Sequence, residues 1–189
     1  MKWLFFLSFI LFSCYGGCDS KSQNDTSVKF NPIHWTECGY EIGEHACDFT
    51  LLDQNKKEWN LYENYGKFIV LDFSTEWCGY CHKAAETTQE IQDAYAEDGL
   101  IYTTILVEDM SGNSPPLEEA IERWCSHYGI TAPVLSAGRD LVAEDSWDVS
   151  SWPTFYILNE DLVIIEVIRG YNEVLLIEAI ERAIQNDSE

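Results

Sequence analysis

Short apolar runs predict the strands of this protein. Runs of this length that are rich in β-branched and aromatic residues are typical of strands buried on both faces of a sheet. They occur at residues 67–73, 100–107, 134–135, 155–158 and 163–168. The last two runs are separated by the polar stretch at residues 159–161, which favours a hairpin turn between them.

Three other segments repeat apolar residues at helical spacing. They are residues 78–97, a segment that begins at Ser114, and residues 173–185. One face of the second segment collects apolar side chains at Leu117, Ala120, Ile121, Trp124, Cys125 and Tyr128. We expect Cys125 to be a buried, unreactive thiol on this face. A further helix or turn is predicted at residues 140–146, and the alternation of strands and helices indicates an α/β protein.

The composition is that of one globular domain with an acidic surface. The chain has 189 residues, and 46% of them are hydrophobic, which is enough for a proper core. The formal net charge of −22 argues against nucleic acid, or an anionic membrane, as a partner attracted by charge. Acidic residues recur along the whole chain, so we interpret them as a solvated surface.

The first residues form a predicted export signal. Lys2 is followed by an apolar stretch at residues 3–12, which is shorter than the roughly 20 residues that a membrane-spanning helix needs. Small residues then precede Cys18, an arrangement that resembles the cleavage and lipidation site of bacterial lipoproteins. We therefore predict a lipoprotein signal at residues 1–18, with Cys18 as the lipid anchor. Cys14 is the alternative anchor, and a cleaved signal without lipid is the alternative to both.

A polar segment at residues 19–36 follows and is predicted to be a flexible tether, which leaves residues 37–189 for the domain. Near the start of that domain lie Cys38 and Cys47. In an exported chain, two cysteines so close in sequence suggest a structural disulfide. The alternative is a zinc site, with a spacing that matches no standard pattern, built from His34, Cys38, His45 and Cys47.

The strongest chemical signal is a pair of cysteines separated by two residues. Cys78 and Cys81 lie where the strand at residues 67–73 gives way to the helix at residues 78–97. The first turn of a helix has free backbone N–H groups and a partial positive charge, which stabilise a thiolate. We expect Cys78 to be the exposed, attacking thiol. Cys81 follows one turn later on the same side, close enough to form a disulfide with it.

The residues around this motif resemble the active-site segment of thioredoxins. The layout over residues 42–184 resembles the membrane-attached, thioredoxin-like reductases of the TlpA/ResA type. The resemblance is carried by Leu71-Asp72-Phe73, Glu76-Trp77-Cys78-Gly79-x-Cys81 and, far downstream, Trp152-Pro153-Thr154. It implies a thioredoxin fold, a central mixed β-sheet flanked by helices. It also implies an N-terminal hairpin at residues 48–61 and an extra helical segment inserted before the proline.

The same resemblance assigns a role to Asp72. In thioredoxins a matching acid sits under the second cysteine and relays its proton, so we expect Asp72 to serve Cys81. Desolvation inside an apolar strand raises the pKa of a carboxyl group, which suits this role. The alternative is an aspartate at a strand end that simply faces water.

Other residues are expected to support the site. Trp77 is expected to cover its rim, beside Gly79 and Tyr80. Pro153 resembles the cis-proline of the family, in a loop whose backbone pairs with an extended substrate, and Trp152 precedes it. Further along, Gly170 resembles a glycine near the rim of the site.

The motif also departs from the family pattern. The dipeptide between the cysteines is Gly79-Tyr80, and together with His82-Lys83 it resembles the motif of periplasmic disulfide isomerases. Glu86 stands where the helix of the family usually has a proline. Ala84 stands where TlpA-like reductases often have a glutamate.

These features predict a thiol–disulfide oxidoreductase that acts on exported proteins, in the reductase or isomerase direction. Its reducing equivalents are expected from a membrane thiol–disulfide carrier. The expected location is the periplasmic side of the bacterial envelope, with lipid attachment to the membrane, and a soluble periplasmic or secreted form is the alternative. No cofactor or metal is expected, and no nucleic acid.

Other classes of function are compatible with parts of the sequence. Cys78 to His82 reads as C-x-x-C-H, the pattern of covalent haem attachment, for which Met110 is the available methionine ligand. A peroxiredoxin would have a Thr three residues before its cysteine, as Thr75 is here, but its motif has proline where Leu71 stands. A metal-binding or partner-binding module that uses Cys78, Cys81 and His82 is the alternative without catalysis.

Overall fold

The computed structural model describes residues 33–143 and 146–186. These residues belong to one compact unit, residues 32–189. The signal at residues 1–18, with Cys14 and Cys18, lies outside the described residues, as does most of the predicted tether.

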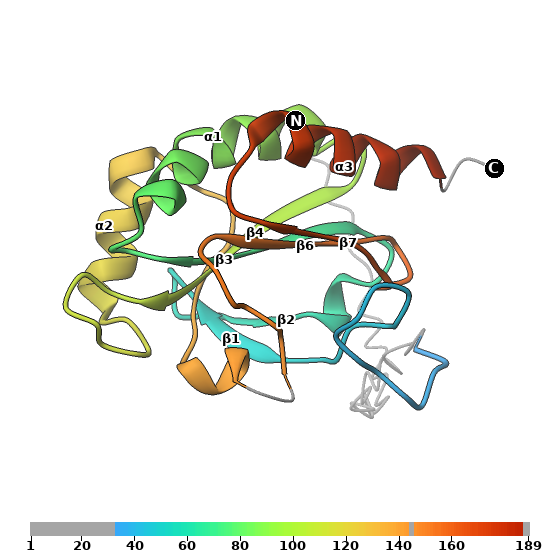
Figure 1. The fold of residues 1–189 in the computed structure, drawn as a ribbon, viewed down its shortest axis with the longest axis horizontal. Helices are drawn as coiled ribbons and strands as arrows, with labels where there is room; N and C mark the ends of the chain where they lie inside the picture. The colour runs from blue at the N-terminus through green and yellow to red at the C-terminus, as the bar shows by residue number, and fades with distance from the viewer. Residues whose placement is uncertain (1–32, 144–145, 187–189) are drawn as a thin grey trace, which may run out of the picture. The chain divides into compact units, whose positions relative to one another are not determined.

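The described residues form one seven-stranded sheet with the strand order β2-β1-β5-β4-β3-β6-β7 (Figure 1). Its strands are β1 (Thr50–Asp53), β2 (Glu58–Asn60), β3 (Phe68–Thr75), β4 (Leu100–Glu108), β5 (Val134–Ser136), β6 (Thr154–Leu158) and β7 (Ile164–Arg169). Three α-helices and two short 3-10 helices connect them: η1 (Tyr62–Asn64), α1 (Gly79–Tyr95), α2 (Glu118–Tyr128), η2 (Arg139–Val142) and α3 (Glu173–Asn186).

β3 is the central strand of the sheet. It pairs with β4 in parallel and with β6 in antiparallel orientation, and β4 pairs in parallel with β5. All eight residues of β3 are buried, as expected for a strand that has neighbours on both edges and cover on both faces. The mixed sheet flanked by helices is the architecture that the sequence predicts.

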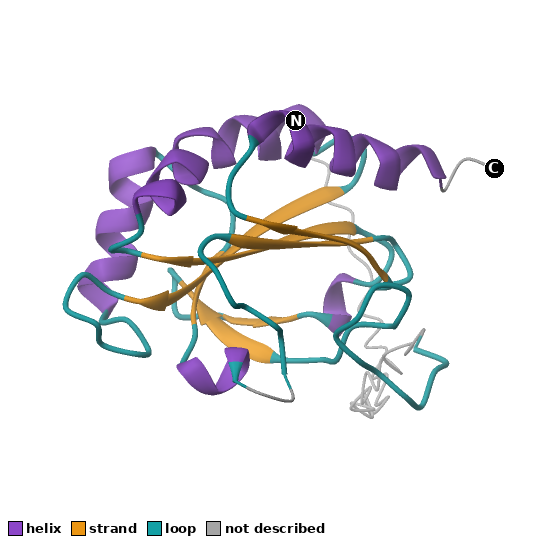
Figure 2. Cartoon of the chain, in the orientation of Figure 1, coloured by secondary structure: helices purple, strands orange, loops and turns teal. Residues whose placement is uncertain are grey.

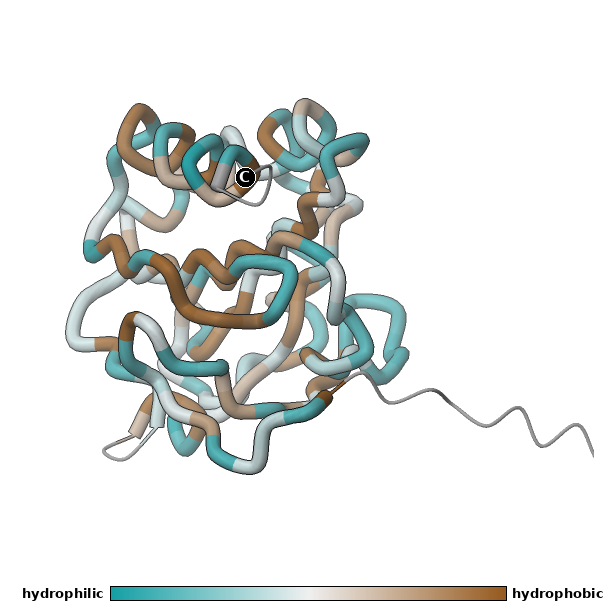
Figure 3. Tube along the Cα trace, turned by 90° about the vertical axis from the view of Figure 1, so that its right-hand side faces the viewer, coloured by the Kyte–Doolittle hydropathy of each residue, from teal (hydrophilic) through white to brown (hydrophobic). Residues whose placement is uncertain are grey.

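One face of the sheet is covered by α1 and α3, which lie side by side above it in Figures 1 and 2. Their buried side chains share a core with β3, β4 and β6, including Val70, Tyr102, Phe155, Leu176 and Ile180. The hydropathy colouring of Figure 3 shows the same layering, with apolar strand segments beneath the two helices. α2 packs beside β5 and contacts α1.

The opposite face is covered by aromatic side chains instead of helices. Trp147 is 1% exposed and is in ring contact with four aromatic residues. Two of them, Phe73 and Tyr156, belong to β3 and β6, with ring centroids 5.5 and 4.8 Å away. The other two, Tyr40 and Phe49, come from the segment before β1. Trp147 therefore fastens the N-terminal segment to the centre of the sheet.

The segment before β1 is also fixed covalently and by the backbone. A disulfide joins Cys38 to Cys47. Backbone hydrogen bonds then attach the enclosed loop to the β6–β7 turn, from Gly43 N–H to the Ile164 carbonyl and from Ala46 N–H to the Leu162 carbonyl. Because the two sulfurs are bonded to each other, they offer no thiolates to zinc, and the structure contradicts the zinc alternative at this place.

Two predicted boundaries are wrong. The central strand, predicted to end at residue 73, continues through Ser74 and Thr75, which are fully buried and pair with β4. The helix predicted from Ser114 begins four residues later, at Glu118, because consecutive prolines hold the chain extended ahead of it. Leu117 therefore precedes the helix and is 56% exposed instead of lying on its buried face.

The aromatic contacts predict a large role for Trp147 in stability. Trp147→Ala should lower the free energy of unfolding by about 3–5 kcal/mol, since it removes a fully buried indole and leaves a cavity. Trp59→Ala, on the partly buried edge strand β2, is the matched control and should cost less than half as much. Urea unfolding followed by far-UV circular dichroism measures both. Equal losses in the two variants would contradict the central role of Trp147.

Candidate active site

The two cysteines of the C-x-x-C motif lie at the junction of β3 and α1. Cys78 is the N-cap residue of α1, and its sulfur accepts a hydrogen bond from the backbone N–H of Cys81, at 3.3 Å. Both cysteines are free thiols in this structure. The geometry is that of an anion-stabilising helix start, with a backbone N–H aimed at the sulfur of Cys78.

Cys78 is less exposed than the sequence predicts. It is 7% exposed and Cys81 is fully buried, so the order of exposure agrees with the prediction but the degree does not. The reason is that both cysteines pack in one apolar cluster with Ile121 and Trp124 of α2 and with Trp152. This cover comes from segments remote in sequence, which a local reading of the motif does not include.

The loop before β6 lies directly against Cys78. The peptide bond between Trp152 and Pro153 is cis, and the Cys78 thiol donates to the Trp152 carbonyl at 3.5 Å. The Pro153 carbonyl accepts from Gly170 N–H at 2.8 Å. Gly170 has a φ of +82°, a conformation that favours glycine. Thus Gly170 fastens the proline loop that lies against the sulfur of Cys78.

Aromatic side chains form the exposed edge of the site. Trp77 and Tyr80 are 47% and 60% exposed, and Gly79 between the cysteines is exposed as well. The indole N–H of Trp77 donates to a Glu108 carboxylate oxygen at 2.8 Å. Trp77 is therefore held in place by β4 while its ring faces solvent.

Asp72 is buried in the centre of the sheet. It is 1% exposed, so the water-facing alternative is wrong. One carboxylate oxygen accepts from the Ser74 hydroxyl at 2.7 Å and the other from the Tyr102 hydroxyl at 3.2 Å. Burial raises the pKa of Asp72 to about 7, and the two hydrogen bonds act in the opposite direction. The group therefore changes its charge near neutral pH.

Cys81 is a poor acid in this environment. Its pKa is raised well above the ordinary value, first by burial, and further by its hydrogen bond with Cys78 and by the negative charge of Asp72. Asp72 and Cys81 lie on consecutive elements of the chain, β3 and α1. A thiol of this kind needs a proton acceptor before it can act as a nucleophile.

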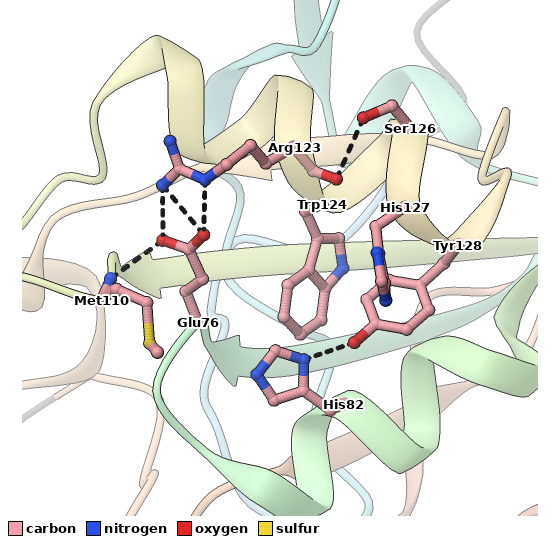
Figure 4. Close-up of a pocket in the computed structure, with 8 residues that line it drawn as sticks. All are labelled: Glu76, His82, Met110, Arg123, Trp124, Ser126, His127 and Tyr128. Atoms are coloured by element: carbon pink, nitrogen blue, oxygen red, sulfur yellow. Dashed lines mark hydrogen bonds and ion pairs between the residues drawn. The ribbon is translucent and has the colours of Figure 1, made fainter.

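Two buried glutamates lie next to the motif, and the sequence analysis assigned a role to neither of them. Glu76 is 6% exposed and forms a two-pronged ion pair with Arg123 of α2, at 2.9–3.0 Å (Figure 4). Glu108, 3% exposed at the end of β4, pairs with Arg139. Each glutamate lies at the end of a strongly apolar strand, and this position could have indicated a buried carboxylate from the sequence alone. Their arginine partners lie on distant segments, and only the fold brings them together.

The geometry of the site bears on the haem and metal-binding alternatives. Burial of the Cys81 sulfur and near-burial of Cys78 leave no surface for a porphyrin attached to both. A ring nitrogen of His82 is hydrogen-bonded to the Tyr128 hydroxyl of α2. Among the described residues, no three His, Cys, Asp or Glu side chains are grouped so as to hold a metal ion.

The chain is similar in sequence to thioredoxin-like proteins of bacilli. The chain is 28% identical over 131 residues to the thioredoxin-like protein YneN of Bacillus subtilis, covering 69% of this chain and 73% of that one. It is 26% identical over 131 residues to the thiol-disulfide oxidoreductase ResA of Bacillus thuringiensis, covering 69% and 70%.

Among solved structures, a thiol:disulfide interchange protein from a Bacteroides species superposes with a TM-score of 0.64 at 16% identity. The match covers 77% of this chain and 91% of that one, and it confirms the thioredoxin fold. The model of the AhpC/TSA family matches residues 42–167, more than half of the chain and the whole stretch from the N-terminal hairpin to β7. The protein therefore belongs to the AhpC/TSA family.

Proposed function

We propose that this thioredoxin-like protein-disulfide oxidoreductase works through Cys78 as the attacking thiol and Cys81 as the resolving thiol. The Cys78 thiolate forms a bond with one sulfur of a substrate disulfide, and the other substrate sulfur leaves as a thiolate. The Cys81 thiolate then attacks Cys78 and releases the second substrate sulfur. The substrate gains two electrons, and the C-x-x-C pair is oxidised to a disulfide.

The observation that carries this assignment is the asymmetry of the two sulfurs. The Cys78 sulfur accepts a helix N-terminal hydrogen bond and lies beside the proline loop, whereas Cys81 is fully buried and weakly acidic. A substrate can reach the first sulfur at the rim, and the second can act only from inside the domain. This division suits an enzyme whose intermediate is a mixed disulfide on Cys78.

Asp72 supplies the proton acceptor in this proposal. With a pKa of about 7, it is ionised in a useful fraction of molecules at neutral pH. Loss of the Cys81 proton is unfavourable without help, because burial favours the neutral thiol. A general base whose pKa lies near the working pH transfers protons most effectively. Ser74 and Tyr102 are positioning residues that hold the carboxylate and tune its pKa.

The substrates in this proposal are disulfides of exported proteins, bound as extended chains along the Trp152–Pro153 loop. The isomerase-like Gly79-Tyr80 dipeptide and the sequence resemblance favour the reductase or isomerase direction, supplied by a membrane thiol–disulfide carrier. Lipid attachment at Cys18 on the periplasmic side of the envelope rests on the sequence. Among the residues that the structure describes, none of the helices has the length and apolar character needed to cross a bilayer.

Trapping distinguishes the two cysteines. Cys81→Ser removes resolution and preserves the first attack, so we expect stable, reductant-sensitive adducts between the variant and exported proteins. Cys78→Ser should give almost none, since the remaining sulfur is buried. Non-reducing gels and mass spectrometry of the captured partners measure both, and would also identify substrates and electron donor. Equal trapping by the two variants would show that the roles are wrongly assigned.

The pH dependence tests Asp72. Release of a mixed disulfide should accelerate as pH rises through about 7, because only ionised Asp72 accepts a proton. Asp72→Asn should lose this rise, and near pH 8 it should resolve the mixed disulfide about tenfold more slowly than the unchanged protein. The difference in resolution rate between Asp72→Asn and the unchanged protein should narrow at high pH, where Cys81 ionises without a proton acceptor. Tyr102→Phe removes a hydrogen bond that lowers the Asp72 pKa, so it should shift the rise to higher pH. Single-turnover kinetics gives these profiles.

A stability measurement shows whether Asp72→Asn is correctly folded. The folded pKa of Asp72 is about 7 against an ordinary value of 3.8, so the native state holds this proton more tightly than the unfolded chain. Stability is then lost as pH rises from about 4 to 7, and Asp72→Asn should be the more stable protein above pH 7, by up to about 4 kcal/mol. An unchanged pH–rate profile in a stabilised variant would rule out Asp72 as the proton acceptor.

Cellular fractionation tests the proposed anchor. Cys18→Ala should move the protein from the membrane fraction to the soluble exported fraction, because a single acyl chain holds only weakly and stable attachment needs the several chains that lipoprotein processing adds. Cys14→Ala is the matched control and should remain on the membrane. Release by Cys14→Ala alone would move the anchor to that residue, and membrane attachment in both variants would exclude lipidation at either cysteine.

A further inference from the structure

A pocket of about 430 Å³ lies between α1 and α2, beside the C-x-x-C motif (Figure 4). Its lining comes from α2, from the first turn of α1, from the loop after β4 and from Glu76 in the loop between β3 and α1. Trp124, His127 and Tyr128 belong to α2, and His82 belongs to the first turn of α1. Met110 lies in the loop after β4. The pocket is therefore formed by the helical segment inserted before the proline together with the helix that bears the cysteines.

Aromatic rings make up most of the wall. The rings of His82 and Trp124 are tilted with centroids 5.2 Å apart, and Trp124 meets Tyr128 edge-on at 5.2 Å. The hydrogen bond between His82 and the Tyr128 hydroxyl fixes one helix against the other. Met110 stands at the edge and is 63% exposed, an unusual position for a large apolar side chain. Rigid aromatic walls with a flexible thioether suit an apolar guest.

Three polar side chains of the pocket, those of Glu76, Arg123 and His82, are already hydrogen-bonded within the protein. Glu76 binds the guanidinium of Arg123 and also accepts from Met110 N–H, at 2.9 Å. The nitrogen of His82 that faces Tyr128 is likewise occupied. A charged guest would have to displace these bonds, whereas an uncharged apolar guest would leave them intact. The chemistry of the wall therefore selects a neutral side chain.

The pocket borders the redox site. Trp124 packs in the same cluster as Cys78 and Cys81 and also lines the pocket. Glu76 and His82 flank the motif in sequence, and the exposed rings of Trp77 and Tyr80 extend the apolar surface around it. An extended polypeptide advances about 3.3 Å per residue, so a chain bound to Cys78 brings its neighbouring residues within reach of the pocket.

We propose that this pocket binds an aromatic or long aliphatic side chain of the substrate polypeptide, placed within about three residues of the cysteine that bonds to Cys78. The proposal rests on the proposed disulfide exchange and adds to it a determinant of substrate choice. The enzyme then prefers disulfides next to apolar residues, which are buried in correctly folded proteins and accessible in unfolded ones.

Peptides test the preference directly. We envisage a series with one intramolecular disulfide in which a single Phe is moved from three residues before to three residues after the first cysteine, and a matched series with Ser. The second-order rate constant for oxidation of the reduced protein is measured by stopped-flow fluorescence. One or two positions should react about tenfold faster with Phe than with Ser, as expected for burial of part of an aromatic ring.

Variants at the exposed edge of the pocket show whether the preference for Phe over Ser arises there. Met110→Ala and His127→Ala change solvent-exposed side chains that line it, so both should fold, and each should lower the Phe-to-Ser rate ratio about threefold. Leu117→Ala is the matched control, because Leu117 is similarly exposed but lies outside the pocket lining. Its ratio should equal that of the unchanged protein.

The outcomes separate this inference from the proposed function. A ratio near one at every position, or a ratio that survives both pocket variants, would overturn the pocket as a subsite while leaving disulfide exchange in place. A loss of the ratio in Leu117→Ala equal to that in Met110→Ala would place the preference outside the pocket, near the start of α2. Failure to react with any peptide, in either series, would instead overturn the proposed exchange activity itself.

Discussion

The chemistry of this protein depends on the cost of placing ionisable groups in a dry interior. Asp72 and Cys81 are both buried where β3 passes beneath α1. Burial raises the pKa of each, so the carboxyl group gains a pKa of about 7 and the thiol stays protonated. The same desolvation that weakens Cys81 as an acid therefore brings the pKa of Asp72 into the neutral range.

The fully buried central strand makes this possible. β3 is paired on both edges and covered by α1 and α3 on one face and by the Trp147 cluster on the other. A side chain in such a strand has little freedom to reach water, so Asp72 is satisfied by Ser74 and Tyr102 instead. Rigid packing thus supports the geometry of the reacting groups, which extends from the end of the strand into the first turn of the helix.

Two buried carboxylates connect the motif to the inserted segment between β4 and β6. Glu76 binds Arg123 of α2, and Glu108 binds both Arg139 of η2 and the Trp77 indole. Removing either arginine would be costly because it would leave a buried carboxylate without a compensating charge. The insertion is therefore fastened to the active-site loop at two points, and it supplies the aromatic wall of the adjacent pocket.

The sequence by itself determined the parts that depend on local pattern. The apolar runs gave the central strands, and the C-x-x-C after a buried strand placed Cys78 at a helix start. The resemblance added Asp72 and the Trp152–Pro153 loop. Only the tertiary structure decided how far Cys78 is covered, which hydroxyls hold Asp72, and which arginines neutralise Glu76 and Glu108. These features join residues up to 74 positions apart, and hydrophobic periodicity reports which face of an element is buried without naming its partner.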